Sequence, residues 1–206
     1  MSEKQCVVAM DLEGVLVPEI WIAFAEKTGI PELRRTTRDE PDYDKLMRGR
    51  LKILDDRGLG LPDIQEVIGT LRPLDGAAEF LSELRSFAQA IILSDTFEQF
   101  AAPLMKQLDW PTLLCHRLVT DASGRIVDYR LRMQNQKMHA VKALQSLNYR
   151  VIAFGDSFND TAMIGQADRG FLFHAPGNVK AQFPQFPAFD DYGPLLAEIR
   201  AEIERS

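Results

Sequence analysis

The sequence predicts an α/β protein with a doubly wound parallel sheet, one inserted helical block and one small β-hairpin. Two observations lead to this fold class. Short apolar runs rich in β-branched residues alternate with segments of helical spacing along most of the chain, as strands and helices alternate in parallel sheets. Between residues 18 and 71 every segment has helical spacing. We therefore expect a core formed by residues 1–17 and 72–206 and a helical cap subdomain at residues 18–71.

Each expected strand is a short apolar run bounded by polar residues or a turn. The first, "CVVAM", is followed at once by acidic residues. A hairpin is indicated where two alternating runs flank Asp121-Ala122-Ser123-Gly124, because such residues form the turns between antiparallel strands. We expect strands at residues 6–10, 88–96 and 170–175, a strand running into a Gly-Asp turn at 149–160, and the hairpin at 112–133.

The expected helices repeat apolar residues at intervals of three and four. The first cap helix has Gly29 near its C-terminal end, and glycine commonly ends helices. The second begins at Asp42, a favourable N-cap residue, and ends at Gly58. We expect cap helices at residues 19–30, 42–58 and 61–71, and core helices at residues 73–86, 97–108, 137–147, 160–167 and 193–206.

The composition of the chain excludes several classes of protein. With 206 residues and 46% hydrophobic content, the chain can bury a substantial core. A net charge of −6 argues against nucleic acid as the main partner, because phosphate backbones attract Lys/Arg stripes. No run approaches the roughly 18 apolar residues of a membrane span, and the N-terminal run is too short for a signal peptide. We expect a cytoplasmic protein with small-molecule partners.

Three expected strands end in polar side chains. The polar groups at or just after these strand ends are Asp11-Leu12-Glu13, Ser94-Asp95-Thr96 and Gly155-Asp156-Ser157. Ligands of open parallel sheets bind outside the carboxyl ends of the strands, so these groups are expected to share one crevice. Each aspartate taken alone could be an ordinary turn or cap residue. Because the acids would repel one another, their convergence favours a cation site, and carboxylates suit Mg²⁺.

A phosphorylated ligand would fit beside such a cation. Ser94 stands at a strand end, where backbone N–H groups can face an anion. A basic residue is also needed, and two lysines of one expected helix are candidates. We favour Lys137 over Lys142, because Lys137 lies at the start of this helix and therefore nearer the expected crevice.

Four stretches of the chain resemble the motifs of the haloacid-dehalogenase-type (HAD) phosphotransferases, in order. They are "DLEGVL" (11–16), "ILSDT" (92–96), Lys137 and "GDSFND" (155–160). The helical block resembles the C1 cap of that superfamily. The resemblance is greatest to the phosphoserine phosphatase branch, and in particular to bacterial bifunctional phosphoserine phosphatase/homoserine phosphotransferases, through "DLEGVLVPEIW" (11–21) and the "FHAP…FPQFP" pattern (173–187).

The resemblance implies a role for each motif residue. Asp11 would attack phosphorus and form an aspartyl-phosphate, while Glu13 would act as general acid and then as general base. Mg²⁺ would be bound by Asp11, Asp156 and the backbone carbonyl of Glu13. Further residues would hold the substrate or support the site: Ser94 and Lys137 for the phosphoryl oxygens, Asn159 for phosphate or substrate, Asp160 for orienting Lys137 or metal-bound water, Glu19 for an ammonium group and Arg50 for a carboxylate.

The chain departs from the family pattern at two of these positions. Most HAD phosphatases have aspartate where this chain has Glu13, which lengthens the reach of the acid by one methylene. Phosphoserine phosphatases tend to have glycine where this chain has Asp95. We expect Asp95 to lie near the substrate and to favour its ammonium group.

The function implied by the resemblance is hydrolysis of phosphoserine, with transfer of the phosphoryl group to homoserine as a second activity. One alternative is a HAD phosphatase acting on another small phosphate ester. A non-enzymatic phospho-accepting receiver domain is another, but a receiver has no helical insertion after its first strand. A binding module that has lost catalysis is disfavoured because all the expected catalytic groups are present.

Overall fold

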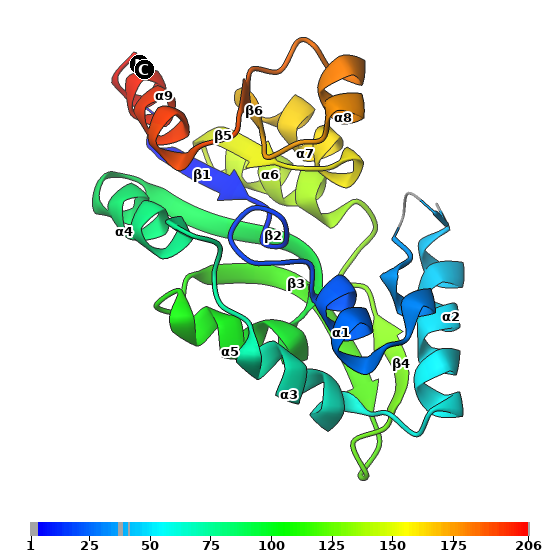
Figure 1. The fold of residues 1–206 in the computed structure, drawn as a ribbon. Coiled ribbons are helices and arrows are strands. Elements are labelled where there is room, and N and C mark those ends of the chain that lie inside the picture. Colours follow the sequence, from blue (N-terminus) through cyan, green and yellow to red (C-terminus); the bar gives the residue numbers. More distant parts are fainter. Residues whose placement is uncertain (1–3, 37–38, 41, 206) are drawn as a thin grey trace.

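A seven-stranded sheet forms the centre of the molecule in the computed structural model, which describes residues 4–36, 39–40 and 42–205 (Figure 1). The described strands follow the order β4-β3-β2-β1-β5-β6-β7. All neighbouring pairs are parallel except β3 and β4. The predicted fold class is therefore confirmed. The strands are β1 (Cys6–Met10), β2 (Gln89–Phe97), β3 (Thr112–Thr120), β4 (Ile126–Arg130), β5 (Arg150–Gly155), β6 (Arg169–Phe173) and β7 (Ala188–Phe189).

Helices cover both faces of this sheet, because alternate residues of the central strands point to opposite sides. On β1, Ala9 packs in one apolar cluster with residues of three helices, while Val8 and Met10 pack in the other. The first face is covered by α6 (Gln136–Ser146), α7 (Thr161–Gln166) and α8 (Gly177–Gln182). The second is covered by α4 (Ala77–Phe87), α5 (Glu98–Gln107) and α9 (Tyr192–Glu204).

The inserted block is helical, as the periodicity indicates. It contains α1 (Ile20–Thr28), the short 3₁₀ helix η1 (Pro31–Arg34), α2 (Tyr43–Asp56) and α3 (Leu61–Thr70). Its apolar side chains belong to the same cluster as those of α5 and β3, and the rings of Trp21 and Phe100 meet edge to face at 5.5 Å. No helix in the described part of the chain is long and apolar enough to cross a membrane.

The predicted hairpin is present and forms one edge of the main sheet. Its first strand, β3, pairs in parallel with β2 and so extends the main sheet, and β4 then closes that edge by antiparallel pairing. Four short elements were not predicted: η1, α8, β7 and the 3₁₀ turn η2 (Phe158–Asp160). They contain two to six residues each, too few for a periodic pattern to emerge.

Close packing of α7 on β6 explains why a glycine stands at position 170. A Cβ atom there would lie 2.5 Å from both Cγ2 and the carbonyl oxygen of Ile164. A Cβ atom on Gly49, an exposed residue inside α2, would meet nothing within 4 Å. These two positions form a matched pair for testing the packing.

We expect Gly170→Ala to lower the free energy of unfolding by about 1–3 kcal/mol, because helix and strand must move apart. Gly49→Ala should raise it by roughly 0.5–1 kcal/mol, since alanine is the better helix former. Urea unfolding followed by circular dichroism measures both changes. Equal stabilities of Gly170→Ala and the wild type would contradict the packing described for α7.

Candidate active site

A cavity of about 380 Å³ lies where the carboxyl ends of β1, β2 and β5 meet the cap. Both the core and the helical block contribute to its wall, as expected for a parallel sheet with an inserted cap. The structure brings nine of the ten predicted site residues to this wall, with Asp160 buried directly behind it. The nine are Asp11, Glu13, Glu19, Arg50, Ser94, Asp95, Lys137, Asp156 and Asn159.

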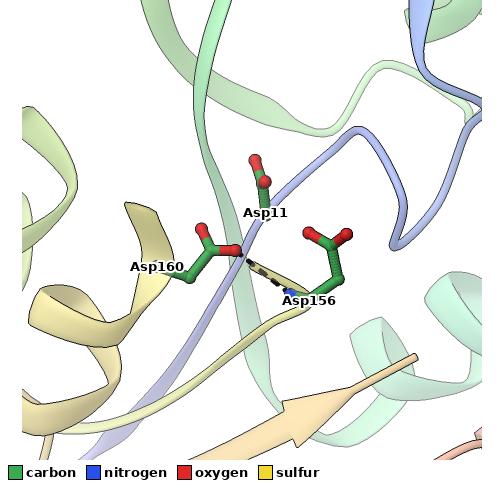
Figure 2. Close-up of side chains that lie close together, drawn as sticks. All are labelled: Asp11, Asp156 and Asp160. Carbon is green, nitrogen blue, oxygen red and sulfur yellow. Dashed lines mark hydrogen bonds between the residues drawn. The ribbon is translucent and has the colours of Figure 1, made fainter. Parts of the chain in front are cut away.

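Three buried carboxylates lie close together at the cavity (Figure 2), and two of them, Asp11 and Asp156, belong to its wall. One oxygen of each of Asp11, Asp156 and Asp160 lies within 4.8 Å of the others. The approach of Asp156 requires Gly14, whose φ is +75° and where a Cβ atom would lie 2.5 Å from Asp156 Oδ2. Glycine alone allows both this backbone conformation and this contact.

Lys137 neutralises part of this charge. Its Nζ lies 2.9 Å from Asp11 Oδ1, 2.7 Å from Asp160 Oδ1 and 3.9 Å from Asp95 Oδ2. Burial opposes its positive charge, but the three aspartates hold the pKa of Lys137 well above its usual range. The alternative candidate, Lys142, is exposed on the same helix. The structure therefore places Lys137, and not Lys142, beside the acids.

Asp160 is fully buried and its oxygens are already engaged. Oδ1 accepts the hydrogen bond from Lys137, while Oδ2 accepts the backbone N–H groups of Asp156 at 3.1 Å and Ser157 at 3.0 Å. A Cβ atom at position 155 would lie 2.4 Å from Asp160 Cγ, so Gly155 leaves the space that Asp160 occupies. This geometry fixes the turn after β5 and orients Lys137.

The described acids carry more negative charge than Lys137 can balance. Burial and the charge of Asp160 raise the pKa of Asp11 well above its usual range. Burial, Asp160 and Glu19 together raise the pKa of Asp156 to about 7. Ionising these carboxyl groups together costs free energy unless a positive charge lies close by. They are therefore a suitable donor set for a hard divalent cation, which prefers oxygen ligands.

Glu13 points to the start of the cap and does not join the three aspartates. Its Oε2 accepts the N–H of Ile20, the first residue of α1, at 2.9 Å. Burial raises the pKa of Glu13, while this hydrogen bond and the charge of Arg50 act in the opposite direction. A carboxyl group with a raised pKa in a cavity can give up and take back a proton.

Arg50 reaches the cavity from α2 and is 7% exposed, so it does not lie on a solvated helix face. Its guanidinium lies 4.5 Å from the ring centre of Trp21, and Nη2 donates to the Arg35 carbonyl at 2.7 Å. Its buried Nε has no hydrogen-bond partner among the described residues. Burial lowers the pKa of Arg50 to about 10, which leaves the group charged at neutral pH. A ligand carboxylate would satisfy the unpaired donor.

Several residues of the site were not predicted. Trp21 packs in the apolar cluster that includes the cap, and it also lines the cavity beneath Arg50. Tyr43 also lines the cavity, and His116 and Gln136 surround Asp95 from outside it. Both oxygens of Asp95 already accept hydrogen bonds, so its expected contact with a substrate ammonium stays a prediction.

Buried acids and a lysine meet at the carboxyl edge of a doubly wound sheet, under a helical cap, and the acids supply donor atoms suited to a metal ion. Residues 7–168 match the model of the haloacid dehalogenase-like hydrolases. The chain therefore belongs to this family of hydrolases.

Relatives with high sequence identity to this chain have names more specific than that of the family. The chain is 62% identical over 192 residues to a phosphoserine phosphatase of Pseudomonas syringae, covering 93% of this chain and 81% of the relative. It is 60% identical over 200 residues to the phosphoserine phosphatase ThrH of Pseudomonas aeruginosa, covering 97% and 98% of the two chains. A solved substrate-bound phosphoserine phosphatase complex shares the fold, with a TM-score of 0.76 at 19% identity over 93% of this chain and 95% of that one.

The raised pKa of Asp156 generates a prediction for the metal-free protein. A carboxyl group whose pKa is higher in the folded state than in the unfolded state destabilises the fold once the pH exceeds the unfolded-state pKa. The loss of stability is complete when the pH exceeds the folded-state pKa. In EDTA, Asp156→Asn should therefore raise the melting temperature more at pH 8 than at pH 5.5. The exposed Asp75→Asn serves as control and should show no such difference. An equal effect of Asp156→Asn at both pH values would contradict the charge crowding described here.

Proposed function

We propose that the protein is a Mg²⁺-dependent phosphoserine phosphatase that works through an aspartyl-phosphate, and that it also transfers the phosphoryl group to homoserine. One observation carries the substrate assignment. A single cavity contains groups suited to a phosphoryl group, namely Lys137, Ser94 and the acid cluster, and groups suited to an amino acid, namely Arg50 and Glu19. The names of the relatives from the two Pseudomonas species support the same substrate.

The residues present fit a magnesium ion. Asp11 and Asp156 would hold it through their carboxylates, with the backbone carbonyl of Glu13 as a further ligand, while Asp160 has both oxygens engaged elsewhere. When bound, the ion would offset negative charge on the phosphoryl group during transfer.

The contacts of Asp11 support its proposed role as the attacking group. Oδ1 accepts the N–H of Leu12 at 2.7 Å and lies 2.9 Å from Lys137 Nζ, so the two donors hold the carboxylate in place. One oxygen of this carboxylate would form the new bond to phosphorus as the bond between phosphorus and the serine oxygen breaks. Glu13 would donate a proton to the departing serine oxygen.

The second half-reaction would use the same groups in reverse. The Glu13 carboxylate would take a proton from water, the water oxygen would bond to phosphorus, and the Asp11–phosphorus bond would break to release phosphate. Homoserine is serine lengthened by one methylene, so its hydroxyl could replace water while Glu19 and Arg50 hold its ammonium and carboxylate groups. Exclusion of water by the cap would then favour transfer.

Phosphorus NMR tests this proposal with purified protein, phosphoserine and Mg²⁺. We expect phosphate release that is lost in EDTA and in Asp11→Asn. Addition of homoserine should produce homoserine phosphate at the expense of free phosphate. Phosphate as the only product would restrict the activity to hydrolysis. No turnover of phosphoserine, with turnover of other small phosphate esters, would show that the substrate assignment is wrong and the alternative phosphatase activity right.

The role of Arg50 yields a separate prediction. Arg50→Lys should raise KM for phosphoserine by roughly 10–100-fold, because a lysine cannot bind a carboxylate in two places. Turnover of p-nitrophenyl phosphate, which has no carboxylate, should change by less than about threefold. The matched control is Arg48→Lys, two residues away on α2, where the exposed guanidinium binds Asp128 at 2.8 Å. Equal losses with both substrates would instead assign Arg50 a role in cap structure.

A further inference from the structure

Asp95 is the centre of a hydrogen-bond network at the edge of the cavity. Its Oδ1 accepts from Gln136 Nε2 at 3.1 Å and lies 3.4 Å from His116 Nε2. Its Oδ2 accepts from Asn159 Nδ2 at 3.2 Å and lies 3.9 Å from Lys137 Nζ. Asp95 thus contacts two of the groups proposed to hold the phosphoryl group.

His116 supports Asp95 from behind. The ring is buried, and its Nδ1 accepts the backbone N–H of Arg132 at 3.2 Å. This contact leaves the ring proton on Nε2, the nitrogen that faces the Asp95 carboxylate. The orientation of Gln136 is set in a similar way, because its Oε1 accepts from Arg132 Nε at 2.9 Å and its Nε2 therefore faces Asp95.

The same contacts orient Asn159. Its Oδ1 accepts a hydrogen bond from the Ser157 hydroxyl, and one hydrogen of its Nδ2 is directed at Asp95. An ionised carboxylate only accepts hydrogen bonds, so the amide nitrogen must face Asp95. The second hydrogen of Nδ2 remains for the cavity, which Asn159 lines.

We propose that Asp95 is a positioning residue that holds Asn159 and Lys137 toward the transferring phosphoryl group, and that His116 acts by holding Asp95. The inference rests on the proposed function, since it assumes an aspartyl-phosphate at Asp11. The inference assigns a role to the Asp95 carboxylate, which stands where glycine is usual in phosphoserine phosphatases. An asparagine at position 95 would keep the shape but would direct an NH₂ group at a donor in either orientation.

The test measures binding of beryllium fluoride with Mg²⁺, a mimic of a phosphoryl group on Asp11, by calorimetry. We expect Asp95→Asn and His116→Leu to weaken binding by roughly tenfold or more, because charged hydrogen bonds are lost. His116→Gln, which retains an N–H donor, should lie closer to the wild type. Hydrolysis of p-nitrophenyl phosphate should show a fall in kcat for the same two variants.

Asp168→Asn is the matched control. Asp168 also accepts several hydrogen bonds, from Val151 N at 2.8 Å and Gln145 Nε2 at 3.0 Å, but it lies at the opposite end of β5. It should lower the melting temperature without changing beryllium fluoride binding. If Asp95→Asn does not fold, the beryllium fluoride affinity of His116→Leu tests the proposal on its own.

The outcomes separate this inference from the proposed function. Wild-type affinity retained in Asp95→Asn and His116→Leu would overturn the positioning role and leave the proposed function standing. Equal weakening in His116→Leu and His116→Gln would overturn the role of His116 as a donor to Asp95. No binding to the wild type, together with no phosphoserine turnover, would refute the aspartyl-phosphate itself and the inference with it.

Discussion

The buried contact of Lys137 with Asp11 and Asp160 is the constraint on which the site depends. Lys137 lies at 2.9 and 2.7 Å from these carboxylates and is almost fully buried with them. Removing one partner of such a group leaves an uncompensated charge in a low-dielectric region, which is strongly destabilising. The contact also joins three separate parts of the chain at one point: the end of β1, the turn η2 that follows β5, and the start of α6.

Much of the fold and of the placement of the site could be predicted, because the decisive signals are local. Asp11, Ser94 and Asp156 each follow or end an apolar run, and parallel strands bring such ends to one edge of the sheet. Lys137 could be preferred to Lys142 from its place at a helix start. The roles given to these residues remain proposals.

Other features depend on contacts that no local pattern reports. His116 reaches the site because β3 pairs with β2 so that Phe97 faces His116, a register set by long-range pairing with an irregularity after Leu93. Trp21 lies at the cavity because α1 turns its ring toward Arg50 of α2, twenty-nine positions further along the chain. Asp160 joins the carboxylate cluster because Gly155 leaves room for it, and the size of that space is visible only in three dimensions.

The apolar cluster shared by the cap and one face of the sheet has a consequence for the motion of the enzyme. Side chains of the cap, among them Trp21, Phe24 and Met47, pack in one continuous cluster with Phe97 and Phe100 of the core. Swinging the whole cap away would expose this surface to water, at a cost of about 25 cal/mol for each Å². Access to the cavity is therefore expected to involve small sliding shifts of packed helices, as in shear motions, and not a free hinge.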